Sequence, residues 1–525
     1  MQTITNKIAF TAPHAAAAEA GMDILKQGGT ATEAMVTAAA VISVVYPHMN
    51  SIGGDGFWLI HNVGDEQPLA IDACGSAPND TSAYAGLAEF PTRGGKACLT
   101  GAATVAGWAK ALANDSHAQL PLSRLLAAAI AFAEDGIEVT ASLQAAVAKV
   151  LAEPVVPESF KALYAPQGKP IVAGEVFKNP QLANTLKTLA EKGLDDFYQG
   201  VIGEKIAAAL TQVNSPITAA DHNATEANVV EPLSVKLNGL RCFNLPAPTQ
   251  GVHSLQILAQ VEQLKQHAET EADWAHLIVE ATKQAFAERS HILACPSSVP
   301  AGYHAALSEP SLSEKAKQID IQQAKPWPFV SEHGDTVWMG ARDKNGQLVS
   351  FIQSVYWEFG SAEVLNGLGF TWNNRGISFS LEEGDINALA PGKKPRHTLN
   401  PAMALFNNGN RLSYGTMGGE GQPQTQAAVF SRFVWQRKSL KAAVAEGRWL
   451  LGRTWGDNSN DLKVEADLAE RIGDELTRRG HKWQVVPACN EMMGHAGAIW
   501  DDQRELDAAT DPRSDGGAFV ASSVE

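Results

Sequence analysis

One segment in the second half of the chain constrains the fold more than any other, because it predicts a complete β-hairpin. From Thr336 the sequence TVWMGARDKNGQLVSFIQSVY places two β-rich runs on either side of Asp343-Lys344-Asn345-Gly346. An Asn-Gly pair supplies the positive φ angles that a tight hairpin turn needs. We therefore predict two antiparallel strands, the first of which begins at Thr336.

Helical patterns dominate much of the remaining chain. Thr30 and Glu33 predict a capping box at the start of an apolar helix that ends before Pro47. This segment is shorter than the ~20 residues of a membrane span, so we expect a buried helix. Alanine-rich patterns near 122–134 and 274–289 predict two more helices. The proline-rich stretch 296–334 shows little periodicity and predicts an exposed connection.

Composition and charge exclude several classes of protein. The 525 residues are 45% hydrophobic and 19% charged, an ordinary globular mixture that excludes a disordered or coiled-coil chain. The net charge of −16 gives no general attraction to nucleic acid or to an anionic membrane, so neither is expected as a partner. Five widely spaced cysteines favour a reducing compartment. The N-terminal sequence lacks a signal-peptide pattern, which predicts a cytoplasmic protein.

The common motifs of metal and nucleotide chemistry are absent from the sequence. There is no HExxH, no GxxxxGK[ST], no EF-hand loop and no GxSxG elbow. The loop Gly53-Gly54-Asp55-Gly56 lies outside any nucleotide-binding fingerprint, and we interpret it as a structural turn. We therefore expect neither a metal ion nor a cofactor.

Seven motifs occur in the order typical of γ-glutamyltranspeptidase-like proteins, and they span nearly the whole chain. They are IGGDGF near Gly53, TVAGW at Thr104, EATKQAFAER at Glu280, DTVWMGARDKNG at Asp335, PGKKPRHTLNP at Pro391, GTMGGEGQ at Gly415 and DPRSDG at Asp511. The resemblance implies an α+β protein, an N-terminal-nucleophile hydrolase with a four-layer αββα sandwich. Such a protein is made as an inactive precursor that cuts itself before a threonine.

The matching cleavage site is the bond between Asp335 and Thr336. The resemblance therefore implies a large subunit, 1–335, and a small subunit, 336–525, which together form one αββα unit as an αβ heterodimer. Whether two heterodimers pair further stays open. The non-catalytic alternative is a scaffold or binding protein that remains uncut.

The chemistry of Thr336 follows from the position of its amino group. A threonine hydroxyl is a poor nucleophile without a base. Cutting the bond to Asp335 frees an α-amino group with a reference pKa of ~7.7–8.0, which suits proton transfer near neutral pH. During self-cleavage the same hydroxyl would attack the Asp335 carbonyl and form an ester that water opens. The alternative is an ordinary threonine of a β-strand.

The resemblance also implies roles for three residues near the nucleophile. Ser354, eighteen positions after Thr336, matches a hydroxyl that hydrogen-bonds the catalytic threonine. Gly418 and Gly419 match paired glycines whose backbone N–H groups stabilise the tetrahedral oxyanion. The alternatives are a plain strand serine and a bare turn.

Five positions depart from the family members that act on γ-glutamyl compounds. Cys74 stands where those proteins carry an arginine for the α-carboxylate, and Ser378 stands where they carry an acidic residue for the α-ammonium. His397 and Thr398 replace paired serines, and Tyr356 replaces an asparagine. Each lost charge-assisted hydrogen bond is worth roughly 1.5–3 kcal/mol, so these changes disfavour a γ-glutamyl substrate.

Arg375 is the cation that this sequence adds, at a position that is uncharged or acidic in the transferases. Because a guanidinium binds a carboxylate bidentately, we expect Arg375, with Tyr356, His397 and Thr398, to hold a small anionic amide. The alternatives are an internal salt bridge for Arg375 and a structural role for His397.

The sequence motifs PRHTLNP and GGEGQPQ resemble those of the oxamate-hydrolysing branch of the family. This resemblance implies conversion of oxamate and water into oxalate and ammonia, a reaction associated with urate breakdown through oxalurate. A γ-glutamyl peptide or a cephalosporin-type amide is the alternative substrate. Lys393 and Lys394 are expected to face solvent.

Overall fold

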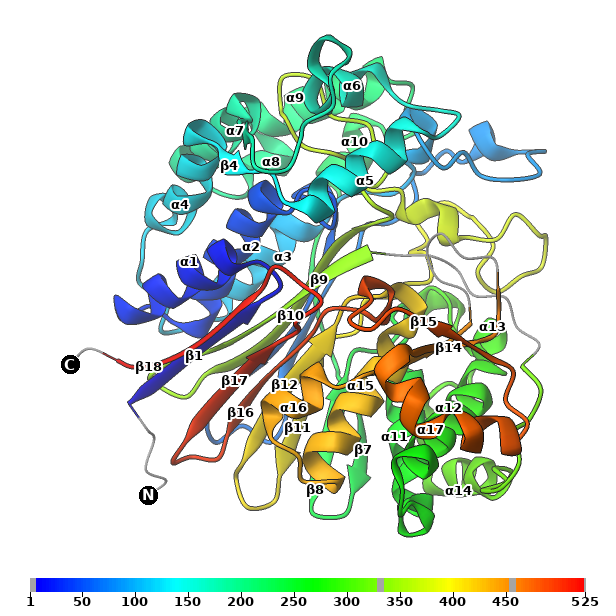
Figure 1. The fold of residues 1–525 in the computed structure, drawn as a ribbon. Coiled ribbons are helices and arrows are strands. Elements are labelled where there is room, and N and C mark those ends of the chain that lie inside the picture. Colours follow the sequence, from blue (N-terminus) through cyan, green and yellow to red (C-terminus); the bar gives the residue numbers. More distant parts are fainter. Residues whose placement is uncertain (1–5, 328–334, 453–458, 524–525) are drawn as a thin grey trace.

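The computed structural model describes residues 6–327, 335–452 and 459–523. Two β-sheets lie face to face, and helices cover the outer side of each sheet (Figure 1). The layers therefore follow the order α, β, β, α. The expected four-layer α+β sandwich is confirmed.

The first sheet has seven strands, and every neighbouring pair in it is antiparallel. In spatial order they are β18 (Gly517–Ser522), β1 (Lys7–Ala12), β9 (Asp335–Arg342), β10 (Leu348–Tyr356), β2 (Asp55–His61), β3 (Leu69–Ala73) and β6 (Asn228–Val230). Strands from both predicted subunits are hydrogen-bonded neighbours in this sheet, with β1 between β18 and β9, and β10 beside β2. A cut before Thr336 would therefore leave both pieces hydrogen-bonded to each other.

The second sheet has six antiparallel strands, again drawn from both halves of the chain. In spatial order they are β17 (Leu506–Thr510), β16 (Ala496–Asp501), β12 (Arg411–Thr416), β11 (Ala402–Phe406), β8 (Leu240–Asn244) and β7 (Leu233–Leu237). Two small sheets lie outside the sandwich. They are formed by β13 (Trp449–Leu451), β14 (Leu462–Glu465) and β15 (Trp483–Val486), and by β4 (Ile137–Glu138) and β5 (Val176–Phe177).

Helices cover the two outer faces (Figure 1). The helices on the side of the first sheet are α1 (Ala15–Lys26), α2 (Ala31–Val45), α3 (Thr104–Ala113), α4 (Leu122–Asp135), α5 (Ala141–Leu151), α6 (Glu158–Tyr164), α7 (Pro180–Lys192), α8 (Asp196–Gln199), α9 (Val201–Gln212) and α10 (Ala219–Asn223). Those on the side of the second sheet are α11 (Gly251–Leu264), α12 (Glu271–Phe286), α13 (Arg289–Ile292), α14 (Glu309–Lys317), α15 (Gln422–Phe430), α16 (Leu440–Ala445) and α17 (Ala466–Arg478).

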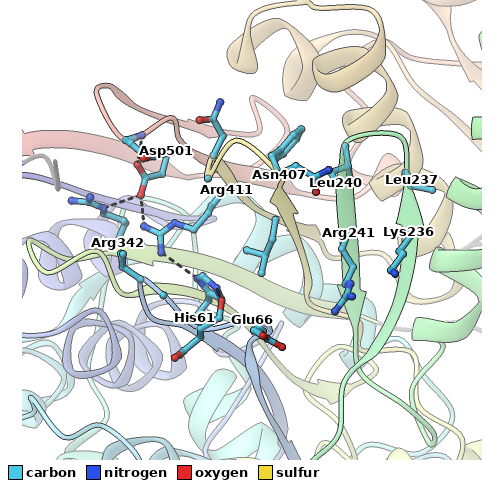
Figure 2. A pocket seen from close by; sticks show the side chains of 18 residues that line it. His61, Glu66, Lys236, Leu237, Leu240, Arg241, Arg342, Asn407, Arg411 and Asp501 are labelled. Carbon is cyan, nitrogen blue, oxygen red and sulfur yellow. Dashed lines mark hydrogen bonds and ion pairs between the residues drawn. The ribbon is translucent and has the colours of Figure 1, made fainter. Parts of the chain in front are cut away.

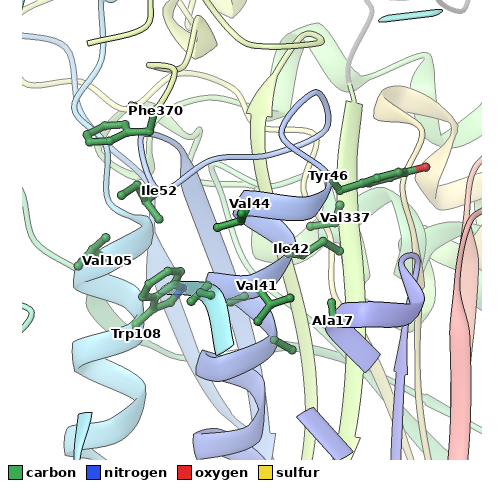
Figure 3. Packing of buried hydrophobic residues seen from close by; sticks show 14 of the residues in the cluster. Ala17, Val41, Ile42, Val44, Tyr46, Ile52, Val105, Trp108, Val337 and Phe370 are labelled. Carbon is green, nitrogen blue, oxygen red and sulfur yellow. The ribbon is translucent and has the colours of Figure 1, made fainter. Parts of the chain in front are cut away.

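An apolar core fills each of the three interfaces between layers. The core between the sheets joins Phe57 and Trp338 of the first sheet to Phe243 and Met403 of the second. On the outer side of the first sheet, all residues of α2 are buried, and Figure 3 shows Val41, Ile42 and Val44 of this helix among the apolar side chains of the cluster. The apolar sequence of α2 thus belongs to the core of the sandwich, as predicted. None of the described helices is long and apolar enough to cross a membrane.

Helix boundaries show what the sequence patterns detected and what they missed. The capping box of Thr30 and Glu33 is present, and Gly136 caps the C-terminus of α4, as predicted. Helix α12 begins at Glu271, three residues before the predicted start. A second capping box, between Thr270 and Asp273, fixes this earlier start.

Two predictions about connections were wrong in part. The β9–β10 hairpin exists, but of its turn residues only Gly346 has a positive φ, 86°. The carboxylate of Asp343 instead accepts the N–H groups of Asn345 and Gln347 at 2.9 Å and holds the turn. The connection expected over 296–334 contains α14 and buries Tyr303, because apolar side chains there pack on α11. Residues 328–334 lie outside the described residues.

An ion-paired group closes the end of the sandwich where β9 finishes and β12 begins (Figure 2). Arg342 of β9 and Arg411 of β12 both bind the carboxylate of Asp501. All three side chains are buried, and they line a cavity of about 680 Å³. Because the two arginines meet here, β9 and β12 run in opposite directions across the interface between the sheets.

Candidate active site

The predicted catalytic hydroxyls lie at one edge of the first sheet, at the end opposite Asp501. Thr336 is the second residue of β9, and Ser354 lies near the end of β10. Asp335 is aligned with Tyr356, and Ser354 is aligned with Asp55, the first residue of β2. A register shift between Gln353 and Tyr356 bends the end of β10 here. The sheet register therefore brings three strand ends together.

The hydroxyl of Thr336 is fully buried, and it has no hydrogen-bond partner among the described residues. A buried hydroxyl without a partner loses its bonds to water at a cost in free energy, so it is available to a ligand or to an attacking step. Ser354 is also buried, and its Oγ accepts the N–H of Tyr356 at 2.8 Å. The two hydroxyls lie on neighbouring antiparallel strands. The eighteen positions of sequence from Thr336 to Ser354 run along β9, through the hairpin turn and back along β10.

The predicted oxyanion turn faces this edge from the second sheet. Trp338 of β9 lies against Gly415 of β12, where an added Cβ would come within 2.2 Å of the indole. Since β9 and β12 run in opposite directions, the residues after β12 lie at the end where β9 starts. Gly418 and Gly419 follow there with φ angles of 119° and 53°, which favour glycine. The turn thus lies at the same end of the sandwich as Thr336, and the oxyanion role of its N–H groups stays a prediction.

Arg375 lies in a short helical turn, and its side chain is buried. Its guanidinium carbon is 3.7 Å from the centre of the Tyr356 ring, and its Nη1 donates to Thr398 Oγ1 at 3.3 Å. The backbone N–H of Arg375 donates to Asn373 Oδ1 at 3.0 Å. Three of the predicted substrate-binding residues therefore form one group, with Asn373 fixing the backbone below it.

Gln250 is a site residue that the sequence analysis missed. Its Nε2 donates to the carbonyl oxygen of Thr398 at 2.7 Å and to that of Gly419 at 2.9 Å. One buried amide thus connects the substrate-binding segment to the oxyanion turn. No local pattern marks a glutamine for this role, because both partners are distant in sequence.

His397 forms hydrogen bonds inside the protein through both ring nitrogens. Its Nδ1 accepts the N–H of Leu399 at 3.3 Å, so the proton of the neutral ring is on Nε2. That Nε2 lies 3.1 Å from Oδ2 of Asp55 and donates to it. Burial, with the charges of Arg375 and Lys394, lowers the pKa of His397 well below its usual value. This geometry favours the structural alternative for His397.

Asp55 was interpreted from sequence as part of a plain turn, but its side chain is buried beside the site. Burial raises its pKa to about 7, although the N–H of Gly75 and the charge of Arg375 act in the opposite direction. A carboxylate within an otherwise all-glycine turn was the available signal. Its function depends on His397, which lies 342 residues away.

The prediction that Lys394 faces solvent was wrong. Its side chain is only 15% exposed, and its Nζ lies 2.7 Å from Oδ2 of Asp72. Burial alone would lower the pKa of Lys394, but the charge and hydrogen bond of Asp72, together with Cys74 and Asp55, outweigh this effect and raise it. Cys74 is buried next to this pair, and burial raises its thiol pKa well above the usual value. The position therefore offers no charge to a substrate.

Two groups of described side chains bring possible metal ligands close together. They are Asp55, Cys74 and His397, and His276, Glu280 and His481. In the first group the charges of Arg375 and Lys394 act on the carboxylate. In the second, Lys283 Nζ lies 2.6 Å from Glu280, and the two imidazoles hydrogen-bond each other at 2.8 Å. Cations and hydrogen bonds thus satisfy both groups, and we assign no metal to either.

Known proteins resemble this chain over nearly its whole length. The family profile described as Gamma-glutamyltranspeptidase matches residues 17–521. An oxamate amidohydrolase proenzyme of Klebsiella pneumoniae is 46% identical over 97% of both chains. A glutathione hydrolase-like proenzyme of Bacillus subtilis is 33% identical over 98% of both. The crystal structure of a cephalosporin acylase from Bacillus halodurans has a TM-score of 0.89 at 32% identity, covering 98% of this chain and 96% of that one.

The four-layer fold, the buried site at its edge and these relatives define a class of protein. This class comprises the self-processing N-terminal-nucleophile hydrolases, which are amidohydrolases that cleave amide C–N bonds. The chain belongs to the γ-glutamyltranspeptidase family.

Proposed function

We propose that the chain cuts itself between Asp335 and Thr336, and that Thr336 then hydrolyses a small anionic amide, with oxamate as the substrate. Residues 1–335 and 336–525 stay together as an αβ heterodimer, because both contribute strands to both sheets. In this proposal Thr336 supplies the nucleophile and, through its free α-amino group, the base.

The reaction proceeds in two steps. The α-amino group takes the proton of Thr336 Oγ1 as the oxygen attacks the amide carbon, and the N–H groups at Gly418 and Gly419 stabilise the oxyanion. The collapsing intermediate breaks the C–N bond, and ammonia leaves with the proton. Water then opens the resulting oxalyl ester and releases oxalate. In this proposal Ser354 hydrogen-bonds the nucleophile after processing and fixes its orientation, although in the uncut chain Thr336 Oγ1 has no partner among the described residues.

The observation that carries the choice of substrate is the arrangement of charge. Arg375 is buried against Tyr356 and Thr398, where its guanidinium can hold a carboxylate. Cys74 and Ser378 stand where a γ-glutamyl substrate would need a cation and an anion. The hydroxyl of Ser378 already donates to the carbonyl oxygens of Arg375 and Arg396, at 2.9 and 2.8 Å. The 46% identical relative, named for oxamate, supports the same substrate.

The test of processing uses the purified protein and a denaturing gel. Two fragments are expected, with N-terminal sequencing of the smaller one starting at Thr336, and Thr336→Ala should remain a single full-length band. A single band from active wild-type protein would contradict the proposal and favour an uncut scaffold.

The test of substrate compares two amides with the processed protein. We expect ammonia release from oxamate at a higher kcat/KM than amine release from γ-glutamyl-p-nitroanilide. Preferential turnover of the γ-glutamyl compound, or of a cephalosporin-type amide as in the Bacillus halodurans relative's name, would overturn the choice of oxamate.

A further inference from the structure

Two buried carboxylates beside the site each contact one backbone N–H group and one nitrogen-containing side chain. Asp72, near the end of β3, accepts the N–H of Cys74 at 3.0 Å and binds Lys394 Nζ at 2.7 Å. Asp55, at the start of the neighbouring β2, accepts the N–H of Gly75 at 2.9 Å and contacts His397 Nε2 at 3.1 Å. Each carboxylate therefore joins the turn at 74–75 to the segment 394–398. We call these two aspartates the double clasp.

The contacts of Asp55 require its charged form. Gly75 N–H can only donate, and His397 Nε2 must also donate, because Nδ1 already accepts the N–H of Leu399. Both carboxylate oxygens thus face donors. A proton on either oxygen would place a donor against a donor and break one of the two hydrogen bonds.

We propose that Asp55 is a positioning and specificity-determining residue, which closes the acid-binding side of the site so that only a compact acid fits between Arg375 and Thr336. This inference rests on the proposed function. Asp55 acts through the residues that it holds: Gly75 next to Cys74 on one side and His397 next to Thr398 on the other. Thr398 in turn contacts Arg375, so the clasp fixes the hydroxyl beside the carboxylate-binding guanidinium.

The charges around the clasp support this role. Lys394 is matched by Asp72, and Cys74 is neutral, so the 74–75 turn offers no free cation to a second carboxylate. Arg375 contacts Tyr356 and Thr398, two of the predicted substrate-binding residues, so it is the cation that we assign to the substrate carboxylate. In this proposal the 74–75 turn limits the length of the acid, and the clasp holds that turn by two backbone N–H groups.

The test uses processed protein and two amides of different length, oxamate and succinamate. Asp55→Gly removes the contacts of Asp55 with Gly75 and His397 and leaves space where the carboxylate was. We expect the ratio of kcat/KM for oxamate over succinamate to fall at least about tenfold, chiefly through a higher KM for oxamate. Asp72→Asn should shift the ratio in the same direction, and it serves as a second variant should Asp55→Gly not fold.

The second readout is the pH profile of Asp55→Asn, which keeps the size of the side chain. The charged and titratable groups that act on Asp55 are Asp72, Cys74, Tyr198, Arg375, Lys394 and His397. Two groups must lose a proton for activity, the Thr336 amine and Asp55. The slope of log kcat/KM against pH on the acid side should therefore fall from about two in the wild type to about one in Asp55→Asn.

The matched control is Asp343→Asn. Asp343 is an equally buried carboxylate that accepts three backbone N–H groups, but it lies at the far end of the hairpin. The Asp343→Asn variant should have a lower Tm but the same kcat/KM ratio of oxamate over succinamate and the same slope of log kcat/KM against pH. Folded Asp55 variants with an unchanged ratio and an unchanged slope would overturn the proposal. If the wild type turns over another amide better than oxamate, the proposed function fails, and the slope on that better amide decides the role of Asp55.

Discussion

The guanidinium of Arg375 stacks on the ring of Tyr356, with the guanidinium carbon 3.7 Å from the ring centre. Tyr356 has a φ of 84°, a rare conformation for an aromatic residue, in the register shift at the end of β10. The strand irregularity therefore aims the ring that supports Arg375. Cation–π contacts of this kind are worth about 2 kcal/mol when shielded from water.

We predict that Arg375→Ala leaves self-cleavage intact but lowers kcat/KM for oxamate about 10- to 150-fold. The loss corresponds to one charge-assisted hydrogen bond of roughly 1.5–3 kcal/mol. Tyr356→Phe keeps the ring that supports Arg375 and removes only the phenol hydroxyl, so its loss of turnover should be smaller than that of Arg375→Ala. Steady-state kinetics on both variants check this expectation. Unchanged turnover in folded Arg375→Ala would show that the carboxylate is bound elsewhere.

Ser354→Ala should slow both self-cleavage and turnover, because Thr336 loses the hydroxyl beside it. General experience with positioned polar groups puts such an effect near 10²-fold. Ser354→Thr keeps the hydroxyl and should retain most of the activity. The rate of fragment formation on a gel and the rate of ammonia release measure the two effects. Equal rates for the alanine and threonine variants would contradict a role for this oxygen.

The packing of Trp338 against two glycines predicts a sharp steric limit between the sheets. A Cβ at Gly415 or Gly497 would come within 2.2 or 2.5 Å of the indole. Gly497→Ala should therefore destabilise the fold by about 1–3 kcal/mol, through overpacking. Gly302→Ala, at a position with nothing within 4 Å, should leave Tm almost unchanged. Thermal unfolding of the two variants tests the difference.

Asp501 should make stability depend on acid pH. Burial alone would raise its pKa, but the charges of Arg411 and Arg342, together with the N–H of Gln503, outweigh burial and lower the pKa below the usual 3.8. A depressed pKa in the folded state stabilises the fold above pH 4, and this stability is lost as pH falls through the folded-state value.

Asp501→Asn leaves two buried guanidinium groups without their carboxylate. It should lower the free energy of unfolding by about 3–5 kcal/mol at neutral pH and flatten the acid dependence. Denaturant unfolding at pH 7 and pH 3 measures both effects. Asp23→Asn, which removes an exposed carboxylate from α1, is the control and should change stability by less than 0.5 kcal/mol. An equal loss at both pH values would exclude the ion pair as the cause.

Local patterns in the sequence predicted those features that depend on neighbouring residues. The capping box of Thr30 and Glu33, the hairpin from Thr336 and the buried helix before Pro47 depend on contacts within one or two turns, so spacing alone reveals them. The motifs around Thr336 and Gly418 likewise indicated the family and its four-layer fold, because motifs and their order can be recognised directly in the sequence.

Tertiary structure decided which distant side chains share the site and which charges are satisfied there. Asp55 and His397 are separated by 342 residues, and Gln250 reaches both Thr398 and Gly419. Hydrogen bonds and ion pairs act over a few ångströms in space, whatever the separation along the chain. Sheet register brings Asp55 to Ser354, and burial then changes its proton affinity, so neither its contacts nor its charge could be derived from the sequence of one turn.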